Sequence, residues 1–261
     1  VQDNLAFPLV CRGYDKAFIK AKVAEVSEAL NLEGLLTQSA NKLTADQKQL
    51  ISLGRGLVRD NVAAVLMDEP LTVIDPDLKF RLRRKLKEIN QKYRSTLIYV
   101  THDQNEAMTF AENIIVMDNG SIVQAGTPSE LFDRPKTTFV GYFIGAPAMN
   151  LFACSAVNNT TISFGGAEIV TDTNLEAVAS KNLKLGIRSE YIKLVTAASE
   201  NTVSAKVQRV EDLGSHKLVT ADFEGQSIKI KVKREQEVPA ENVFLKIPAQ
   251  HCCVYENEHL I

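Results

Sequence analysis

The sequence lacks the features of a membrane-spanning, secreted or zinc-binding chain. No apolar run approaches the ~20 residues that a helix needs to cross a bilayer, and no charged-then-apolar signal segment stands at the start. The four cysteines show neither a C-x-x-C spacing nor the nearby histidines that a zinc site requires. We therefore expect Cys11, Cys154, Cys252 and Cys253 to be reduced thiols in the cytosol.

No charge of either sign dominates. The 261 residues include 30 Lys and Arg against 32 Asp and Glu, so the net charge directs the molecule towards neither nucleic acid nor anionic lipid. We expect no nucleic-acid partner, and any nucleotide site must be a local feature. At this length, the 45% hydrophobic content is enough for one large domain or two smaller ones, which excludes a disordered or fibrous chain.

The N-terminal part of the sequence predicts two amphipathic helices. Apolar residues recur at helical spacing over residues 15–30, and Asp15 stands where its side chain can cap the first turn. A second helix is expected to begin at Thr44, because its hydroxyl can cap the helix while Gln47 reaches back from three residues later.

Two short apolar runs, each followed by a helical pattern, predict a parallel sheet. Residues 62–67 form an unbroken apolar run that predicts a strand buried on both faces, and residues 96–100 predict a second strand. Helical spacing follows over 78–93 and again over 104–112. Strand, helix, strand is typical of an α/β sheet. The many basic residues within 78–93 are expected to be solvated rather than to bind phosphate.

After Pro147 the pattern changes to short segments in which polar and apolar residues alternate. A hairpin over 114–124 and a short capped helix from Thr127 are expected before this change. The segments beyond it predict a separate all-β unit, a small barrel or sandwich, and we place the boundary near Asn150. The expected strands are 161–164, 183–188, 203–210, 217–223, 228–232 and 243–247.

Two acidic residues and a histidine stand at the ends of the predicted strands. Asp68 and Glu69 follow the first strand, and the carboxyl edge of a parallel sheet is where α/β folds bind ligands. One carboxylate can hold Mg²⁺ through water while the other polarises an attacking water. His102 follows the second strand, where a neutral imidazole can contact a γ-phosphate. Each residue alone is more often structural, but their combination favours phosphate chemistry.

These residues lie in motifs that resemble the ATP-binding-cassette (ABC) family along nearly the whole chain. V-L-M-D-E-P at 65–70 is similar to the Walker B strand, V-I-D at 73–75 to the D-loop, Y-V-T-H-D at 99–103 to the switch-histidine segment and L-T-A-D-Q at 43–47 to the signature L-S-G-G-Q. Four further segments resemble the branch that imports maltose, glycerol phosphate and related carbohydrates. They are D-N-L-A-F-P-L at 3–9, G-T-P-S-E-L-F at 126–132, M-N-L-F at 149–152 and L-G-I-R-S-E-Y-I at 185–192, the last similar to its oligonucleotide-fold-like TOBE domain.

The resemblance assigns roles to the motif residues. It implies that Glu69 is the catalytic base, that His102 is the γ-phosphate switch and that Asp68 is the magnesium ligand and contacts the nucleotide. It implies that Asp75 lies at a dimer interface near the nucleotide. The signature residues that it implies as nucleotide-contacting are Leu43, Thr44, Ala45, Asp46 and Gln47.

The resemblance also implies a fold and a function. The expected fold is a partial α/β P-loop NTPase domain over 1–149, followed by an all-β OB-like TOBE domain over 150–261. The expected function is hydrolysis of ATP with Mg²⁺, which powers uptake of a carbohydrate, glycerol or glycerol-phosphate-like solute. The implied partners are a second ABC ATPase subunit, membrane permease subunits and, indirectly, a periplasmic or extracellular solute-binding protein. The implied location is the cytoplasmic face of the cell membrane.

The phosphate-binding loop of this family does not occur in the sequence. No G-x-x-x-x-G-K-[ST] is found, so the backbone N–H groups and the lysine that neutralise the phosphates are missing. The adenine-stacking aromatic and the Q-loop glutamine of the family are expected upstream of Val1 as well. We interpret the chain as a truncated domain, which by itself is expected to be inactive and to bind no ATP measurably.

The signature departs from the family at two positions. Ala45 and Asp46 replace the glycine pair that lets the helix N-terminus of one subunit approach the γ-phosphate held by the other. Ala45 adds a methyl group, and Asp46 adds a negative charge beside a phosphate. This interpretation predicts a heterodimer with a partner whose glycines are intact. The alternative is that Asp46 only stabilises the positive end of the helix dipole.

Three functions compete. The first is the transport ATPase, and the second is a non-catalytic regulatory or docking subunit with a degenerate nucleotide site. The retained Asp68, Glu69 and His102 favour the first, whereas the altered signature favours the second. A third, a soluble cassette ATPase of DNA repair or translation, is opposed by the C-terminal β domain.

Overall fold

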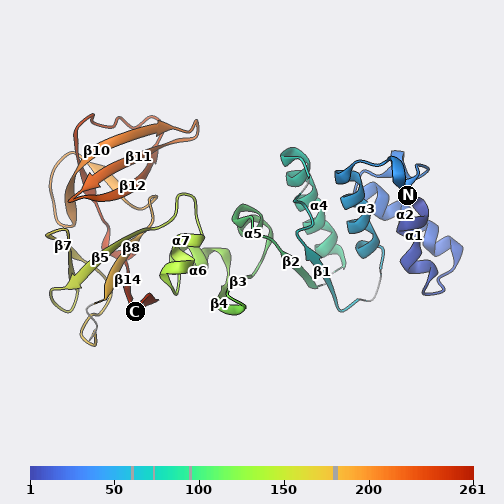
Figure 1. Ribbon diagram of the computed structural model, residues 1–261, viewed down its shortest axis with the longest axis horizontal. Helices are drawn as coiled ribbons and strands as arrows, with labels where there is room; N and C mark the ends of the chain where they lie inside the picture. The colour runs from blue at the N-terminus through green and yellow to red at the C-terminus, as the bar shows by residue number, and fades with distance from the viewer. Residues whose placement is uncertain (60–61, 73, 94–95, 179–181) are drawn as a thin grey trace. The chain divides into compact units, whose positions relative to one another are not determined.

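The computed structural model describes residues 1–59, 62–72, 74–93, 96–178 and 182–261, which divide into two compact units (Figure 1). The first unit is Val1–Phe110 and the second is Ala111–Ile261. Within the described residues, every helix is too short or too polar to span a bilayer. The domain assignment of 1–149 and 150–261 stays a prediction; by their contacts, residues 111–149 group with the second unit rather than with the first.

Helices build the N-terminal end of the first unit: α1 (Gln2–Val10), α2 (Lys16–Ala29) and α3 (Ala45–Leu57), with short 3-10 turns at Glu33–Leu35 and Ala40–Lys42. Asp15 caps α2, since its Oδ1 accepts a hydrogen bond from Phe18 N at 2.8 Å. A capping box closes the start of α3, where Thr44 N donates to Gln47 Oε1 at 3.1 Å. Both predicted helices are therefore confirmed.

The sequence pattern did not predict α1, because Pro8 lies inside it. Proline removes a backbone donor and crowds the preceding turn, so its presence argues against a helix. Packing offsets this cost, since Leu5 and Leu9 are fully buried. Gly54 on α3 leaves room for this contact: a Cβ at Gly54 would stand 2.6 Å from Leu5 Cδ2.

The predicted parallel sheet is confirmed. Its strands are β1 (Ala64–Asp68) and β2 (Thr96–Val100), and the helices that follow them are α4 (Pro76–Tyr93) and α5 (Gln104–Phe110). The strands pair in parallel register from Ala64 opposite Thr96 to Asp68 opposite Val100. Helix α5 ends two residues earlier than the sequence pattern suggested.

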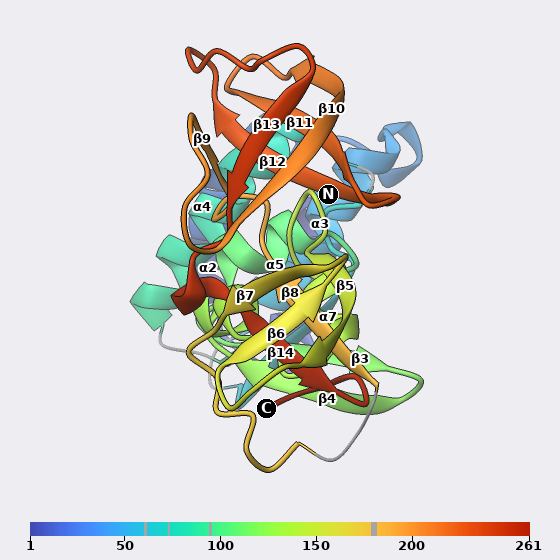
Figure 2. The ribbon, with the colours of Figure 1, turned by 90° about the vertical axis from the view of Figure 1, so that its left-hand side faces the viewer.

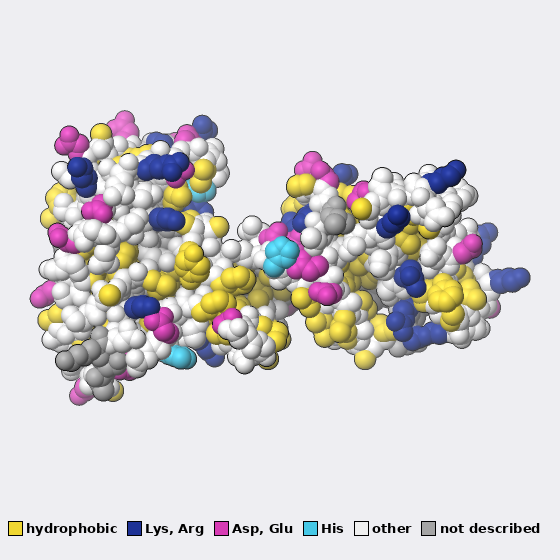
Figure 3. Space-filling view, viewed as in Figure 1, with side chains coloured by type: hydrophobic (Ala, Val, Ile, Leu, Met, Phe, Trp, Pro, Cys, Tyr) yellow, Lys and Arg dark blue, Asp and Glu magenta, His cyan; other side chains and the backbone are white. Residues whose placement is uncertain are grey.

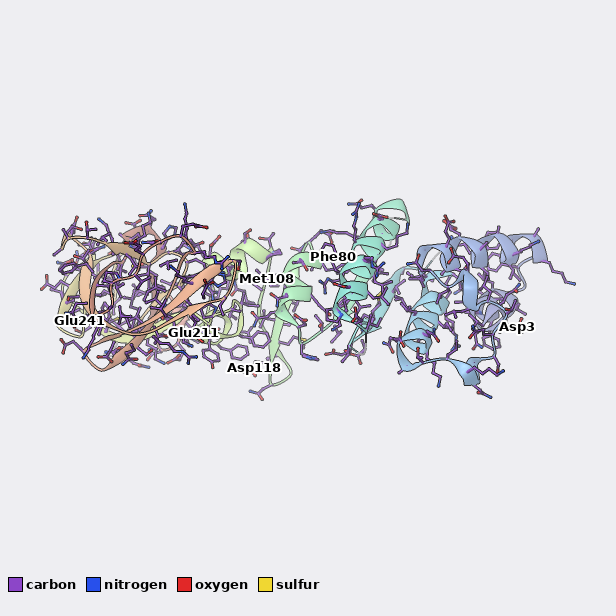
Figure 4. All side chains as sticks on the ribbon, turned by 90° about the horizontal axis from the view of Figure 1, so that it is seen from above. Asp3, Phe80, Met108, Asp118, Glu211 and Glu241 are labelled. Atoms are coloured by element: carbon purple, nitrogen blue, oxygen red, sulfur yellow. The ribbon has the colours of Figure 1, made fainter. Side chains whose placement is uncertain are left out.

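The expectation that β1 is buried on both faces is wrong. Met67 and Tyr99 pack into the core of the first unit, but Leu66 is 74% exposed and Ile98 is exposed beside it. Among the described residues of this unit, only β2 pairs with β1, and side chains cover one face of the pair. Exposed apolar side chains of this kind appear in yellow in Figure 3, and Figure 4 labels another one, Phe80 on α4.

The second unit begins with a hairpin and two short helices: β3 (Ile114–Asp118), β4 (Ser121–Gly126), α6 (Pro128–Asp133) and α7 (Thr138–Phe143). The hairpin turns at Asn119 and Gly120, which both adopt positive φ. A capping box starts α6, where Thr127 N donates to Glu130 Oε2 at 2.7 Å. The hairpin and α6 are confirmed, whereas α7 was not predicted.

Two antiparallel sheets form the rest of the second unit (Figure 2). In spatial order, one consists of β15 (His259–Leu260), β14 (Cys253–Glu256), β8 (Leu183–Ile187), β5 (Asn150–Ala156), β6 (Thr161–Phe164) and β7 (Ala167–Val170). The other consists of β12 (Gln226–Lys233), β11 (His216–Phe223), β10 (Thr202–Asp212), β13 (Asn242–Lys246) and β9 (Lys193–Val195). Both sheets contribute to one core, for example Leu185 from the first and Ile230 from the second. The all-β expectation is therefore confirmed.

A buried arginine joins α6 and α7 to the loop after β8. Arg188 is 1% exposed, and its Nε donates to Phe132 O at 3.0 Å while Nη1 donates to Gly141 O at 2.8 Å and to Ile144 O. The guanidinium also lies over the Phe132 ring, 4.4 Å from its centroid. These carbonyls lie at helix C-termini, where intrahelical donors run out, so the arginine supplies donors to them; Gly141 O also accepts from Met149 N at 3.3 Å.

We expect Arg188→Met to lower the free energy of unfolding of the second unit by about 2–4 kcal/mol, because several buried carbonyls lose their donors. Urea unfolding of the chain, followed by the amide resonances of β8 and β14, measures the change. The matched control is Arg209→Met on the exposed part of β10, for which we expect a change within about 0.5 kcal/mol. Equal midpoints for the two variants would contradict the role of Arg188.

Candidate active site

Glu69 directly follows β1 and is held at the carboxyl edge of the parallel pair. Its N–H donates to Val100 O at 2.9 Å, which extends the pairing of β1 with β2 by one residue. Thr72 Oγ1 donates to Glu69 Oε2 at 2.7 Å. Glu69 adopts a φ of 48°, in the left-handed region that a non-glycine residue occupies at an energetic cost. Such strain is concentrated at functional sites, where the surrounding structure holds it in place.

His102 lies beside Glu69, although 33 residues separate them. Its Nδ1 is 2.5 Å from Glu69 Oε1, and its backbone N–H donates to the same oxygen at 3.2 Å. The imidazole is 77% exposed, so a ligand can reach it. Parallel pairing explains the contact, because both residues follow strands that end at the same edge. The sequence predicted this edge, and the structure brings the two side chains together there.

The contact changes the proton affinity of both groups. The hydrogen bond from Thr72, and then that with His102, hold the pKa of Glu69 below its usual value. The Glu69 carboxylate in turn raises the pKa of His102. The raised histidine pKa adds stability that is complete below ~6.5 and is lost as the pH rises through the folded value. The lowered Glu69 pKa adds stability that is complete above ~4.3, so both contributions are complete between these pH values.

Two residues that the sequence did not single out complete a hollow around this pair. The hollow is lined by Gln49, Glu69, Thr72 and His102. Gln49 Nε2 donates to Pro70 O at 3.1 Å and to Glu69 O at 3.4 Å, and thereby connects α3 to the end of β1. The only sequence signal for Thr72 was a hydroxyl three residues after an acid, and Gln49 carried none beyond its nearness to the signature.

The remaining acidic candidates near the end of β1 and the start of α4 are Asp68 and Asp75. Asp68 ends β1, with an exposed side chain. Asp75 caps α4, since its Oδ1 accepts from Asp77 N at 3.0 Å and from Leu78 N at 3.5 Å. Val73, which belongs to the V-I-D segment, lies outside the described residues. A dimer-interface role for Asp75 stays a prediction.

The signature segment forms the start of α3. Leu43 is buried in the core, whereas Thr44 and Ala45 are exposed and Asp46 and Gln47 are half-buried. The Thr44 hydroxyl donates to the Asp46 carboxylate, and this hydrogen bond is the main cause that lowers the pKa of Asp46. In the described part of the chain, no hydrogen bond or ion pair joins these five residues to the Glu69–His102 pair.

A magnesium-binding role for Asp68 stays a prediction. Within the described ranges, no group of three His, Cys, Asp or Glu side chains can enclose a metal ion. Mg²⁺ is commonly held by one or two carboxylates together with phosphate oxygens and water, so a single exposed carboxylate such as Asp68 is an adequate protein ligand.

Comparison with known proteins finds one matching domain profile and relatives that are similar along nearly the whole chain. A profile of the TOBE domain matches residues 185–254. The chain is 35% identical over 261 residues to the sn-glycerol-3-phosphate import ATP-binding protein UgpC of Salmonella typhimurium, covering 99% of this chain and 73% of that protein. The protein of the same name from Escherichia coli O6:K15:H31 is 34% identical over 262 residues, again covering 99% of this chain and 73% of that protein.

We expect the pKa of His102 to lie above its ordinary value and to fall in Glu69→Gln, because the substitution removes the carboxylate that favours the imidazolium. Titration of the His102 ring by NMR measures both values. Glu88→Gln, at an exposed carboxylate of α4 that pairs with Arg84, is the control variant and is expected to leave the His102 titration unchanged. A His102 pKa that is the same in both proteins would show that the contact does not persist in solution.

Proposed function

This chain belongs to the ATP-binding subunits of ABC importers, and from that premise we propose that Glu69 and His102 are its catalytic pair for transport-coupled ATP hydrolysis. The observation that carries the proposal is the 2.5 Å contact between His102 Nδ1 and Glu69 Oε1 at the carboxyl edge of β1 and β2. A base and a phosphate-contacting group must stand together for this chemistry, and these two do.

The proposed chemistry assigns one task to each side chain. Glu69 Oε2 or Oε1 accepts a proton from the attacking water, as a bond forms between the water oxygen and Pγ and the bond from Pγ to the β–γ bridging oxygen breaks. His102 contacts a γ-phosphate oxygen and holds it in line. Asp68 would hold Mg²⁺, directly or through water, and the ion would supply positive charge to neutralise the phosphates. Glu69 is ionised at neutral pH, as a base must be, since its pKa lies below the ordinary value of a glutamate.

The proposed assembly supplies what these 261 residues do not carry. The phosphate-cradling backbone and lysine must come from a P-loop, which does not occur in this sequence. By analogy with relatives named as import ATP-binding proteins, the partners are permease subunits in the membrane and, through them, a solute-binding protein. The subunit would then act at the cytoplasmic face. Relatives named for sn-glycerol-3-phosphate support a glycerol-phosphate or carbohydrate-like solute.

A second candidate function is a regulatory or docking subunit without its own turnover. The observation that favours it is the pair Ala45 and Asp46 at the start of α3. An ionised Asp46 lies where the first-turn N–H groups of the helix would otherwise receive a phosphate.

For the catalytic function, we propose that the working ATPase is a heterodimer, in which a partner with an intact glycine pair completes the site built on Glu69, while the opposite site is weak.

A chimera tests the catalytic pair. In this chimera, a P-loop segment from the Escherichia coli protein is fused in front of Val1. We expect Glu69→Gln to keep ATP binding in the chimera but to slow turnover by at least ~100-fold, because the general base is lost. Calorimetry measures binding and phosphate release measures turnover. Glu112→Gln, at an exposed position, is the control. The 261-residue chain alone is expected to show no measurable binding, and near-normal turnover of the Glu69→Gln chimera would remove this residue from the mechanism.

A second series of variants tests the heterodimer. We expect Asp46→Gly to restore hydrolysis in a homodimer of the chimera far more than it improves a co-assembly with a glycine-pair partner, since the homodimer carries the like-charge repulsion at both sites. Asp46→Asn separates charge from size, because it keeps the volume and removes the charge. Strong ATP-driven dimerisation and turnover by the unmodified homodimer would contradict the proposal.

A further inference from the structure

A buried carboxylate on α5 holds four side chains near the catalytic pair. Glu106 is 3% exposed, and its Oε2 accepts hydrogen bonds from Tyr99 Oη at 2.9 Å and from Thr101 Oγ1 at 3.0 Å. Its Oε1 lies 3.3 Å from Lys79 Nζ and 3.7 Å from Arg83 Nη1 on α4. One residue thus connects β2, the loop after β2 and α4.

The cluster corrects one expectation from the sequence. The basic residues of α4 were expected to be solvated, and Arg84 is indeed exposed, but the side chains of Lys79 and Arg83 are only 20% exposed and face Glu106. A carboxylate removed from water is costly unless cations and hydroxyls compensate it, which is what these side chains do. A group kept at that cost is a candidate for a functional constraint.

Thr101 transmits the contact to the histidine loop. Its Oγ1 donates to Glu106 and also accepts from Asp103 N at 3.0 Å. Asp103 Oδ1 in turn accepts from Asn105 N at 2.9 Å and from Glu106 N at 3.3 Å, which caps α5. His102 lies between Thr101 and Asp103, so the residues on both sides of the histidine are hydrogen-bonded to Glu106.

The same carboxylate reaches the start of α4. Lys79 N donates to Asp75 O at 2.8 Å, so Lys79 belongs to the first turn that Asp75 caps. A displacement of this turn would change the distance between Lys79 Nζ and Glu106 Oε1. Because Glu106 also holds Thr101, the displacement would reach the loop that carries His102.

We propose that Glu106 is a positioning residue that fixes His102 against Glu69 and couples that placement to the helix turn capped by Asp75. The inference rests on the proposed role of His102 in ATP hydrolysis. It gives a physical route by which contact of a partner subunit with Asp75 would alter the placement of the γ-phosphate switch. Glu106 itself does not touch the reacting atoms.

Backbone amide exchange in the 261-residue chain tests the proposal without nucleotide. In Glu106→Gln we expect the His102 and Asp103 amides to exchange at least ~10-fold faster, while the amides of α3 and of the second unit keep their rates. The substitution weakens the anchor of the loop and the ion pairs to α4, whereas α3 loses no direct contact. The ring resonance of His102 should shift towards its position in Glu69→Gln. Glu88→Gln is the matched control, since Glu88 is exposed on α4 and pairs with Arg84.

Two results would overturn the proposal. One is exchange of His102 and Asp103 within twofold of the unmodified chain, and the other is uniform acceleration across the first unit, which would mean that Glu106 only stabilises the fold. If Glu106→Gln does not fold, Thr101→Val is measured in the same way. It removes the hydrogen bond to Glu106 and also the acceptor of Asp103 N, so in this variant the His102 amide and ring carry the test. These measurements need no ATPase activity, so they separate failure of this proposal from failure of the proposed catalytic pair.

Discussion

The parallel pairing of β1 with β2 is the constraint on which the candidate site depends. Parallel strands end at a common edge, and the bond from Glu69 N to Val100 O carries the pairing one residue beyond β1. That bond places the Glu69 carboxylate within reach of His102. Thr72, Gln49 and Glu106 add hydrogen bonds around these two strand ends, but none of them would bring the pair together if the strands ran in opposite directions.

Two glutamates at this edge illustrate opposite uses of the same side chain. Glu69 is partly exposed and shares its oxygens with Thr72 and His102, so a water or phosphate can approach it. Glu106 is buried between two cations and two hydroxyls: its Oε2 accepts both hydroxyl hydrogen bonds, whereas its Oε1 lies at ion-pair distance from Lys79 and Arg83 without a hydrogen bond. The exposed carboxylate is accessible for a reaction, whereas the buried one holds neighbouring side chains in position. The first follows a strand, whereas the second faces the core from a helix.

Asp46 shows how one electrostatic field can serve stability and oppose binding. The positive end of α3 attracts any nearby anion, and here the carboxylate of its own first turn takes that place, with the Thr44 hydroxyl as a donor. The interaction that stabilises the free subunit is therefore the one that would compete with an incoming phosphate. This arrangement favours the regulatory or docking function, and for the catalytic function it favours a partner subunit with an intact glycine pair.

The sequence alone predicted α2 to α6, the strands β1 to β4, six strands of the β unit and the edge of the site, but not α7, β5, β7, β9, β14 or β15. Capping residues such as Asp15 indicated the helices, apolar runs indicated the strands, and the order of motifs pointed to Glu69 and His102. These features depend on residues close together in the chain, which is why local patterns reveal them. It missed α1, because a proline outweighed the buried Leu5. It also missed the roles of Arg188 and Glu106, which only the tertiary structure decided. The partners of these two side chains lie on elements distant in sequence or across a turn. Only packing shows which charged side chain is buried and which groups compensate its charge.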